Sequence, residues 1–365
     1  MRKHIIYRYF LFLSLVGLMQ LTLSCSSSSN EIEPLKPEGE DTPLEKDEYT
    51  FMNVEYRKWQ NGTFQAWTTA DSRETRTIDN MNWYTPSSDY SRTAWGGRIG
   101  LQPSSVVGKE GFFRVANCGG RSYLLDPDNG AVIIHGIQHV RPGESTAHKK
   151  AFGTRYGSEA RWSEETGKLL ADNHINYISY GSNRIEVFPA AVRGNLLTPK
   201  TQKIAYAENL YLLRTFMWDM SKNLGYAFDD DKYNRLVLLF EPTFATYIDR
   251  LVQEKSALFA GDRHFIGFYL DNELPFASYQ GTGYANTEGG GWLVHTQKNR
   301  GEFYQNFCLR LLETRNCVGW VHFEYNDGYD SNGKASNKGV VSIEYEPYES
   351  FLSQMRQLNL SVHSL

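Results

Sequence analysis

The sequence predicts an α/β fold in which a parallel sheet is covered by helices and preceded by a β-rich segment. From residue 131 onward, short apolar runs alternate with segments whose apolar side chains recur every three or four residues. This alternation is typical of strands followed by helices. Before residue 131, short runs are separated by glycine and Asp-Pro turns, which indicates hairpins. The pattern favours a doubly wound sheet or an eightfold barrel.

The amino end predicts an export signal. Basic residues precede an apolar run, Tyr9 to Leu23, which is shorter than the roughly 20 residues of a membrane-spanning helix. The sequence L-T-L-S-C that follows resembles the lipobox of bacterial lipoproteins. The resemblance implies that residues 1–24 are removed and that Cys25 is acylated. The alternatives are a retained anchor helix and a buried or disulfide-bonded cysteine.

The composition of residues 25–48 predicts a disordered tether, because a run of serines is followed by many acidic residues and three prolines. Such a segment buries too little apolar surface to fold, and its like charges extend it. We therefore expect an exported protein that is attached to a bacterial membrane, the outer membrane, by its lipid alone.

More than 300 residues remain after the tether, enough for a substantial core. Residues 49–130 form the predicted β-rich leader, packed on a main domain of residues 131–365. A net charge of −4 gives no basic footprint for nucleic acid. The 14% aromatic share raises the expectation of sugar stacking. The sequence leaves any protein partner open.

The elements follow in order along the chain. Runs at 112–115 and 122–125 predict a hairpin, and Ser158 is the expected cap of a helix that buries Trp162 and Leu170. Further helices are expected from Thr243, around 304–312 and from Pro347. The five expected strands are Ala131–Ile137, Ile175–Tyr180, Asn209–Met217, His264–Leu270 and Cys317–Tyr325. A complete barrel needs eight.

The candidate site is the run F-Y-L-D-N-E-L-P-F, residues 268–276, where an apolar strand ends in Asp271, Asn272 and Glu273. The carboxyl ends of parallel strands face the site in α/β folds, so acids there are natural for catalysis. The alternative is a solvated strand end that caps a helix.

This run resembles the fourth-strand motif of β-agarases and related exported hydrolases of glycoside hydrolase clan A. Residues 111–136, Arg141 to Ser145 and 289–307 resemble further parts of that family, so the resemblance covers most of residues 111–359. It implies a barrel-type (β/α)8 TIM fold, Glu273 as the catalytic acid/base, and Asn272 as a catalytic residue that orients the substrate or the glutamate.

The chain departs from the family after Glu273. The next residues resemble the stretch that follows the seventh strand, so the fifth and sixth units and the nucleophile are expected to be missing. The predicted fold is therefore an incomplete, TIM-barrel-derived domain. Glu288, Glu324 and Asp327 are candidates for a substitute carboxylate, and a surface or loop role is the alternative for each.

Four residues are expected to bind substrate: His135, Trp292, Trp320 and His322. The eighth-strand region differs from the family pattern at Val321 and His322, which puts an aromatic platform in doubt. His135 and His139 have the spacing of a zinc motif, but on a strand they lie about 13 Å apart. We expect no metal and no cofactor.

Three functions follow. The first is a glycoside hydrolase that acts on an extracellular polysaccharide of the galactan type. The second is a catalytically impaired glycan-binding protein derived from the same fold. The third is a scaffold lipoprotein in which residues 271–273 only close a strand. In the first two, the partner is a polysaccharide or oligosaccharide.

Overall fold

The computed structural model describes residues 50–60, 63–81, 90–182, 203–224, 241–271, 292–329 and 335–365. All of these belong to one compact unit, residues 45–365. Among the helices of these ranges, none combines the length and the apolar character needed to cross a bilayer. The expected signal, lipid anchor and tether lie outside these ranges and stay predictions.

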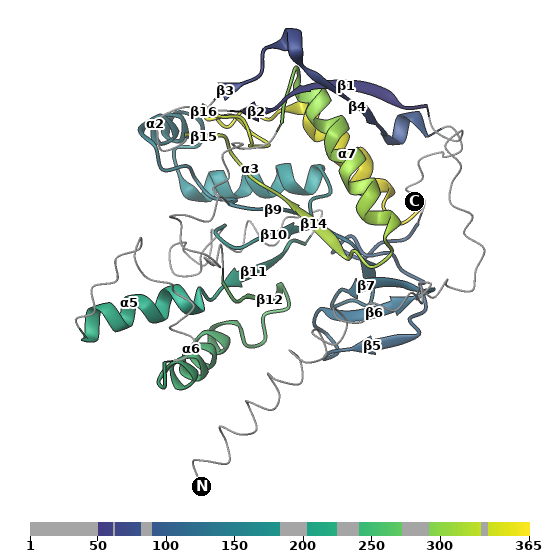
Figure 1. The fold of residues 1–365 in the computed structure, drawn as a ribbon. Coiled ribbons are helices and arrows are strands. Elements are labelled where there is room, and N and C mark those ends of the chain that lie inside the picture. The colour runs from purple at the N-terminus through teal and green to yellow at the C-terminus, as the bar shows by residue number, and fades with distance from the viewer. Residues whose placement is uncertain are drawn as a thin grey trace, which may run out of the picture. The chain divides into compact units, whose positions relative to one another are not determined.

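A parallel sheet of five strands is the centre of the described chain (Figure 1), and its order is β12-β11-β10-β9-β14. In the described residues, helices lie between β9 and β10, between β11 and β12 and between β12 and β14, as in other parallel α/β folds. The predicted α/β class with a parallel sheet is therefore confirmed. The strands are β9 (Ile134–Ile137), β10 (Tyr177–Ile178), β11 (Ala205–Asn209), β12 (Phe265–Tyr269) and β14 (Gly319–His322).

The register of this sheet separates two faces. Ile137 is paired with Ile178, which is paired with Tyr206, and all three belong to the core formed with the helices. On the other face, Gly136 is paired with Tyr177. A Cβ at Gly136 would lie 2.5 Å from the Tyr177 ring, so this glycine makes room for the ring beside the strand.

Three helices begin close to the predicted positions, at Ser158, at Thr243 and after Pro347. Ser158 caps α3, because its hydroxyl accepts a hydrogen bond from the backbone N–H of Arg161, and α3 buries Trp162 and Leu170 completely. The helices are α2 (Thr146–Arg155), α3 (Glu159–Asp172), α5 (Leu212–Leu224), α6 (Phe244–Phe259), α7 (Gln297–Glu313) and α8 (Glu349–Ser361).

One expected strand is wrong. The segment Asn209–Met217 contains the last residue of β11 and the first half of helix α5. Leu213, Phe216 and Met217 are buried together, at the spacing of one helix face. The strand itself is A-Y-A-E-N, whose small and polar residues hide it from a search for apolar runs.

The predicted hairpin is present in an antiparallel sheet with the order β5-β6-β7-β8. Its strands are β5 (Ser105–Val107), β6 (Arg114–Cys118), β7 (Arg121–Leu125) and β8 (Ala131–Val132). Only Ile133 separates β8 from β9, so the expected strand Ala131–Ile137 serves two sheets. Tyr123 and Leu125 share one apolar core with Leu312 and Leu358 of α7 and α8.

A second antiparallel sheet has the order β13-β1-β4, and the remaining elements are short. These strands are β1 (Met52–Arg57), β4 (Asp71–Thr75) and β13 (Leu293–Val294). The remaining pairs are β2 (Trp59–Gln60) with β3 (Thr63–Phe64), and β15 (Gly328–Tyr329) with β16 (Ala335–Ser336). Two 3-10 turns are η2 (Trp67–Thr69) and η3 (Ile78–Asn80).

Candidate functional site

The carboxyl edge of the parallel sheet carries polar and aromatic side chains from four strands. In parallel α/β folds, this edge builds the site because the loops that follow the strands meet there. Here the chain provides His139 after β9, Ser179 and Tyr180 after β10, Tyr269 at the end of β12, and the pair Phe323–Glu324 after β14. These residues form the described part of the candidate site.

Three hydroxyl groups from two strands meet inside this edge. The hydroxyl of Tyr269 lies 3.2 Å from that of Tyr177 and 3.4 Å from that of Ser179. Burial, reinforced by the neighbouring Tyr269, raises the pKa of Tyr177, so its phenol stays protonated. The ring of Tyr180 packs edge-to-face on Tyr269 at 4.7 Å. Neutral hydroxyls beside aromatic rings suit a ligand that is itself rich in hydroxyls.

A histidine–glutamate pair joins the ends of β9 and β14. His139 Nδ1 lies 3.1 Å from Glu324 Oε2, and the side chains are 27% and 16% exposed. The imidazole also packs edge-to-face on Phe323 at 5.1 Å. On its other side lies Gly181, where a Cβ would be only 2.6 Å from His139 Cδ2. The ring is therefore fixed by its neighbours while the pair stays partly open to solvent.

The two residues predicted to be catalytic, Asn272 and Glu273, lie outside the described residues. The described residues break off after Asp271, two positions beyond the end of β12, and resume at Trp292. Asp271 Oδ2 accepts a hydrogen bond of 2.9 Å from the backbone N–H of Leu213, in the first turn of α5. The capping alternative therefore holds for Asp271. The roles of Asn272 and Glu273 stay predictions.

His135 and Trp320, two of the predicted substrate-binding residues, are buried under α7 and α8. They are paired across β9 and β14, and they are 5% and 8% exposed. His135 Nδ1 bonds the carbonyl of His174, and Trp320 Nε1 donates to the Tyr304 hydroxyl. Burial lowers the pKa of His135 to about 4. At these positions neither side chain is accessible to a sugar that arrives from solvent.

His322 lies on the same helix-covered face. Its Nε2 lies 2.9 Å from the carbonyl of Lys338, and its ring packs on Phe351. Burial, with a smaller contribution from Arg300, lowers its pKa to about 4. The side chain therefore has a packing role in the structure, since strand alternation places it on the face of His135 and Trp320.

Trp292, the fourth predicted substrate-binding residue, keeps an open surface. It precedes β13, stacks on Tyr56 at 4.1 Å and is 45% exposed. The guanidinium of Arg73 lies 5.2 Å from the ring. Of the four predicted residues, Trp292 alone is exposed, and its contact with a sugar stays a prediction.

The three residues considered as replacements for the missing nucleophile differ in position and in hydrogen bonding. Asp327 is 6% exposed, and its oxygens accept hydrogen bonds from the backbone N–H of Gly339, the amide of Asn337 and the hydroxyl of Tyr348. This carboxylate therefore holds a loop in place. Glu288 lies outside the described residues. Glu324 is the candidate on the carboxyl edge.

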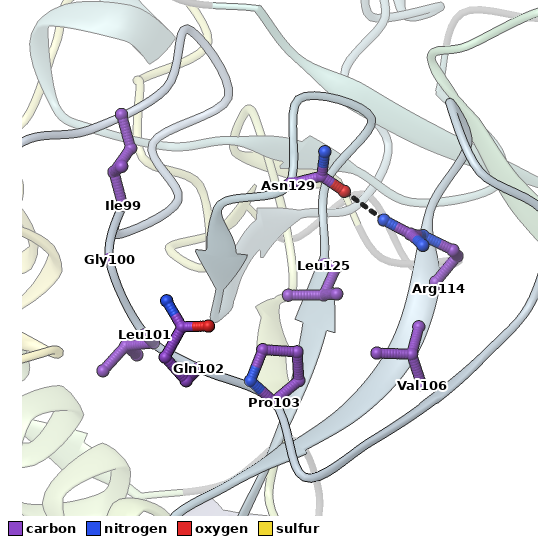
Figure 2. Close-up of a pocket in the computed structure, with 9 residues that line it drawn as sticks. All are labelled: Ile99, Gly100, Leu101, Gln102, Pro103, Val106, Arg114, Leu125 and Asn129. Atoms are coloured by element: carbon purple, nitrogen blue, oxygen red, sulfur yellow. Dashed lines mark hydrogen bonds between the residues drawn. The ribbon is translucent and has the colours of Figure 1, made fainter.

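A cavity of about 440 Å³ lies away from this edge, beside the antiparallel leader sheet (Figure 2). Its lining is mostly apolar, with Leu101, Pro103 and Leu125, and a hydrogen bond joins Arg114 to Asn129 at its rim. The leader sheet runs into the amino end of β9. Since the amino ends of such strands serve stability rather than catalysis, we do not assign the candidate site to this cavity.

In the described ranges, no three His, Cys, Asp or Glu side chains are grouped to hold a metal ion. The expectation that the protein uses no metal stays a prediction.

Sequence reasoning missed the hydroxyl cluster and the role of His139. In the sequence, His139 stands out only through its zinc-like spacing from His135, and Tyr177, Ser179 and Tyr269 belong to segments expected to be strands. The signal that could have found them is position: a polar residue at or just beyond the carboxyl end of a buried parallel strand faces the site.

No protein-family model matches the chain, and no curated protein matches it in sequence. Among solved structures, BpGH50 is similar with a TM-score of 0.67 and 18% identity, over 91% of this chain and 98% of that chain. An agarase, AgWH50C, is similar with a TM-score of 0.45 and 13% identity, over 76% of this chain and 67% of that chain. An exo-β-agarase is similar with a TM-score of 0.46 and 11% identity, over 75% of this chain and 68% of that chain. The likeness to BpGH50 shows a shared fold.

Proposed function

We propose that this protein is a glycoside hydrolase that cleaves an extracellular polysaccharide of the galactan type, with Glu273 as general acid/base and Asn272 as the residue that orients it or the substrate. The observation that carries the proposal is the carboxyl edge of the sheet. There the strand that leads to Asn272 and Glu273 ends beside the hydroxyl of Tyr177 and the ring of Tyr180. The pair His139–Glu324 lies at the carboxyl ends of β9 and β14 in the same sheet. Aromatic faces and hydroxyl donors are the groups that hold a sugar.

The sequence motif is the second support. The run from residue 268 to residue 276 resembles the fourth-strand motif of β-agarases and clan A hydrolases, in which the glutamate after asparagine is the acid/base. The order of the parallel sheet is β12-β11-β10-β9-β14. Counted from β9 as the first strand, β12 is the fourth, as the motif requires. In this order β9 to β12 correspond to the first four strands of a barrel, and β14 corresponds to the eighth.

The fold proposed is a TIM-barrel-derived domain with fewer than eight units. Only 27 residues, 270 to 296, lie between β12 and α7. One strand and one helix with their loops take about 20 residues, so this interval holds at most one complete unit. The one strand described there, β13, pairs antiparallel with β1 and lies outside the parallel sheet.

This shortage of chain favours a second candidate, a glycan-binding protein that has lost catalysis. A retaining glycosidase of clan A places its nucleophile on the seventh strand, and in a retaining enzyme the two carboxyl groups lie about 5 Å apart. If no other carboxylate replaces this nucleophile, the edge still offers sugar contacts without turnover.

For the cell, we propose export, removal of residues 1–24 and lipid attachment at Cys25, with residues 25–48 as a tether at the outer membrane. The β-rich segment 49–130 then belongs to the same folded unit as residues 131–365. The lipid anchor is the only membrane contact in this proposal.

The experiment is a polysaccharide panel on protein that begins at residue 25 with Cys25→Ser. Agarose and other galactans, with xylan and cellulose as unrelated controls, are scored for new reducing ends and for binding. Cleavage of a galactan supports the hydrolase, and binding without cleavage supports the second candidate. If the protein neither binds nor cleaves any of these polysaccharides, both candidate functions are contradicted and a scaffold role is favoured.

A further inference from the structure

An exposed tryptophan beside the β13-β1-β4 sheet lies flat on a buried ring. Trp292 stacks on Tyr56 with ring centres 4.1 Å apart and an interplanar angle of 24°, and Phe303 of α7 meets both rings edge-on. Tyr56 is 7% exposed, whereas Trp292 is 45% exposed. Because Tyr56 covers one face of the indole, the exposed area belongs to the other face and the rim. An indole face that is held in place and open to solvent is a stacking surface for a sugar ring.

Arg73 places a guanidinium beside this indole. It is an exposed residue of β4 and is paired with Val54 of β1, so its side chain projects from the same face of the sheet as Tyr56. The guanidinium carbon lies 5.2 Å from the centre of the Trp292 ring. A cation–π contact of this kind holds the group next to the ring without using its N–H donors.

The acidic residues closest to Arg73 in β4 do not neutralise it. Glu74 follows Arg73 in the strand and therefore projects from the opposite face. Asp71 projects from the same face, but its carboxylate pairs with Lys58 at 3.2 Å. Arg73 has no ion pair with any residue that the structure describes. An unpaired guanidinium has a planar fork of donors that fits the oxygens of an anionic group.

The beginning of α7 connects this surface to the edge that carries the candidate site. β13 ends two residues before Gln297, the first residue of α7, and Figure 1 shows β1 and β4 beside this helix. In the first turn of α7, Arg300 Nη2 lies 3.1 Å from Nε2 of His322, the last residue of β14. Helix α7 therefore begins at the carboxyl end of β14. A polysaccharide that lies along the carboxyl edge has Trp292 on its side of the sheet.

We propose that Trp292 and Arg73 form a binding subsite for a sugar unit that carries an anionic group, either a sulfate ester or a carboxylate. The sugar ring stacks on the indole, and the guanidinium of Arg73 donates hydrogen bonds to the anionic group. The inference rests on the proposed function and deepens it, because it makes the polysaccharide an anionic one. The protein has a net charge of −4, so selectivity for a polyanion comes from this local site and not from a general attraction.

The test measures how tightly the full chain, purified in detergent, binds three polysaccharides. Carrageenan carries sulfate esters, polygalacturonate carries carboxylates, and agarose is neutral. At low salt, the dissociation constant for one of the two anionic polymers should be about tenfold lower than that for agarose, and added salt should reduce this preference. Preference for carrageenan identifies the anionic group as a sulfate ester, and preference for polygalacturonate identifies it as a carboxylate.

Arg73→Gln should weaken binding of the preferred anionic polymer about tenfold and so remove the preference over agarose. Arg73→Glu should weaken it further, because the new carboxylate repels the ligand. Arg250→Gln is the matched control, since it changes the net charge equally. Arg250 of α6 also lies 5.2 Å from the centre of an aromatic ring, that of Tyr247, but it pairs with Glu254. The control should change each dissociation constant by less than about twofold.

Trp292→Ala should weaken binding of both the neutral and the anionic polymer about fivefold, because every sugar ring loses its stacking surface. Phe307→Ala is the control for the loss of an exposed ring, since Phe307 lies on α7 and is 63% exposed. If Trp292→Ala does not fold, Arg73→Glu decides the question, because Arg73 is exposed.

The outcomes separate the subsite from the function on which it rests. A preference that Arg73→Gln removes and Arg250→Gln keeps supports the subsite. Equal losses in these two variants, unchanged binding in Trp292→Ala, or a wild type without any preference for an anionic polymer overturns it. After such a result, cleavage of agarose that is lost in Glu273→Gln still supports the hydrolase. A wild type that binds and cleaves none of the three polymers contradicts both.

Discussion

Replacing the buried His135 should make the protein less sensitive to mild acid. Its pKa is lowered to about 4 by burial, against about 6.5 in an unfolded chain. Below pH 6.5 the imidazole is therefore protonated in the unfolded state but stays neutral in the folded state. The free energy of unfolding falls as the pH drops from about 6.5 toward 4. Between pH 7 and pH 5 this one group costs about 2 kcal/mol of unfolding free energy.

His363 acts in the same direction, because burial lowers its pKa to about 3. Together the two histidines cost about 4 kcal/mol between pH 7 and pH 5, a large part of the 5–15 kcal/mol that stabilises a typical domain. His135→Asn keeps a donor for the His174 carbonyl and cannot take up a proton. The variant is destabilised at pH 7, but its loss between pH 7 and pH 5 should be smaller by about 2 kcal/mol.

The assay is urea denaturation of wild type, His135→Asn and the surface control His295→Asn at the two pH values. His295 pairs with Glu55 and has a 44% exposed side chain. For each protein, the free energy of unfolding at pH 5 is subtracted from that at pH 7. The packing cost of a substitution is the same at both pH values and cancels in this difference. If His135→Asn and wild type lose the same stability between pH 7 and pH 5, the burial argument for His135 is refuted.

Three further outcomes are expected. Cys25→Ala should move the protein from the membrane fraction to the soluble fraction; a protein that stays in the membrane with residues 1–24 attached would favour a signal-anchor helix. Residues 49–130 and 131–365 should unfold in one calorimetric transition, because Tyr123 and Leu125 share a core with Leu312 and Leu358; two separate transitions would contradict this. Ser158→Ala should cost about 1 kcal/mol through loss of the α3 cap, measured as a lower denaturation midpoint, whereas an unchanged midpoint would show that the cap contributes nothing.

Elements with strong local signals were predictable from the sequence. The cap at Ser158, the helix from Thr243 and the apolar face of α8 follow from side-chain type and spacing, and the structure has all three. The strand β11 was not predictable in this way. Its residues A-Y-A-E-N include two alanines, a glutamate and an asparagine, although the strand is flanked by β12 and β10 in the sheet, so tertiary position overrides strand propensity.

The site was predictable only in part, for a geometric reason. Asp271 stands out in sequence because it follows an apolar strand, yet it caps α5, and only the fold brings α5 to it. The pairing of His139 with Glu324 joins residues 185 positions apart. The sequence places His135, Trp320 and His322 on strands but does not say which face is covered by α7 and α8.

The measurement that tests the central claim most directly is the turnover of Glu273→Gln on a galactan that wild type cleaves, with binding of the same galactan measured in parallel. The account predicts that cleavage is abolished while folding and binding stay nearly unchanged, because the amide keeps the shape of the acid but cannot transfer a proton. An active wild type whose turnover is untouched by Glu273→Gln would contradict it, and would remove the carboxyl end of β12 from the chemistry.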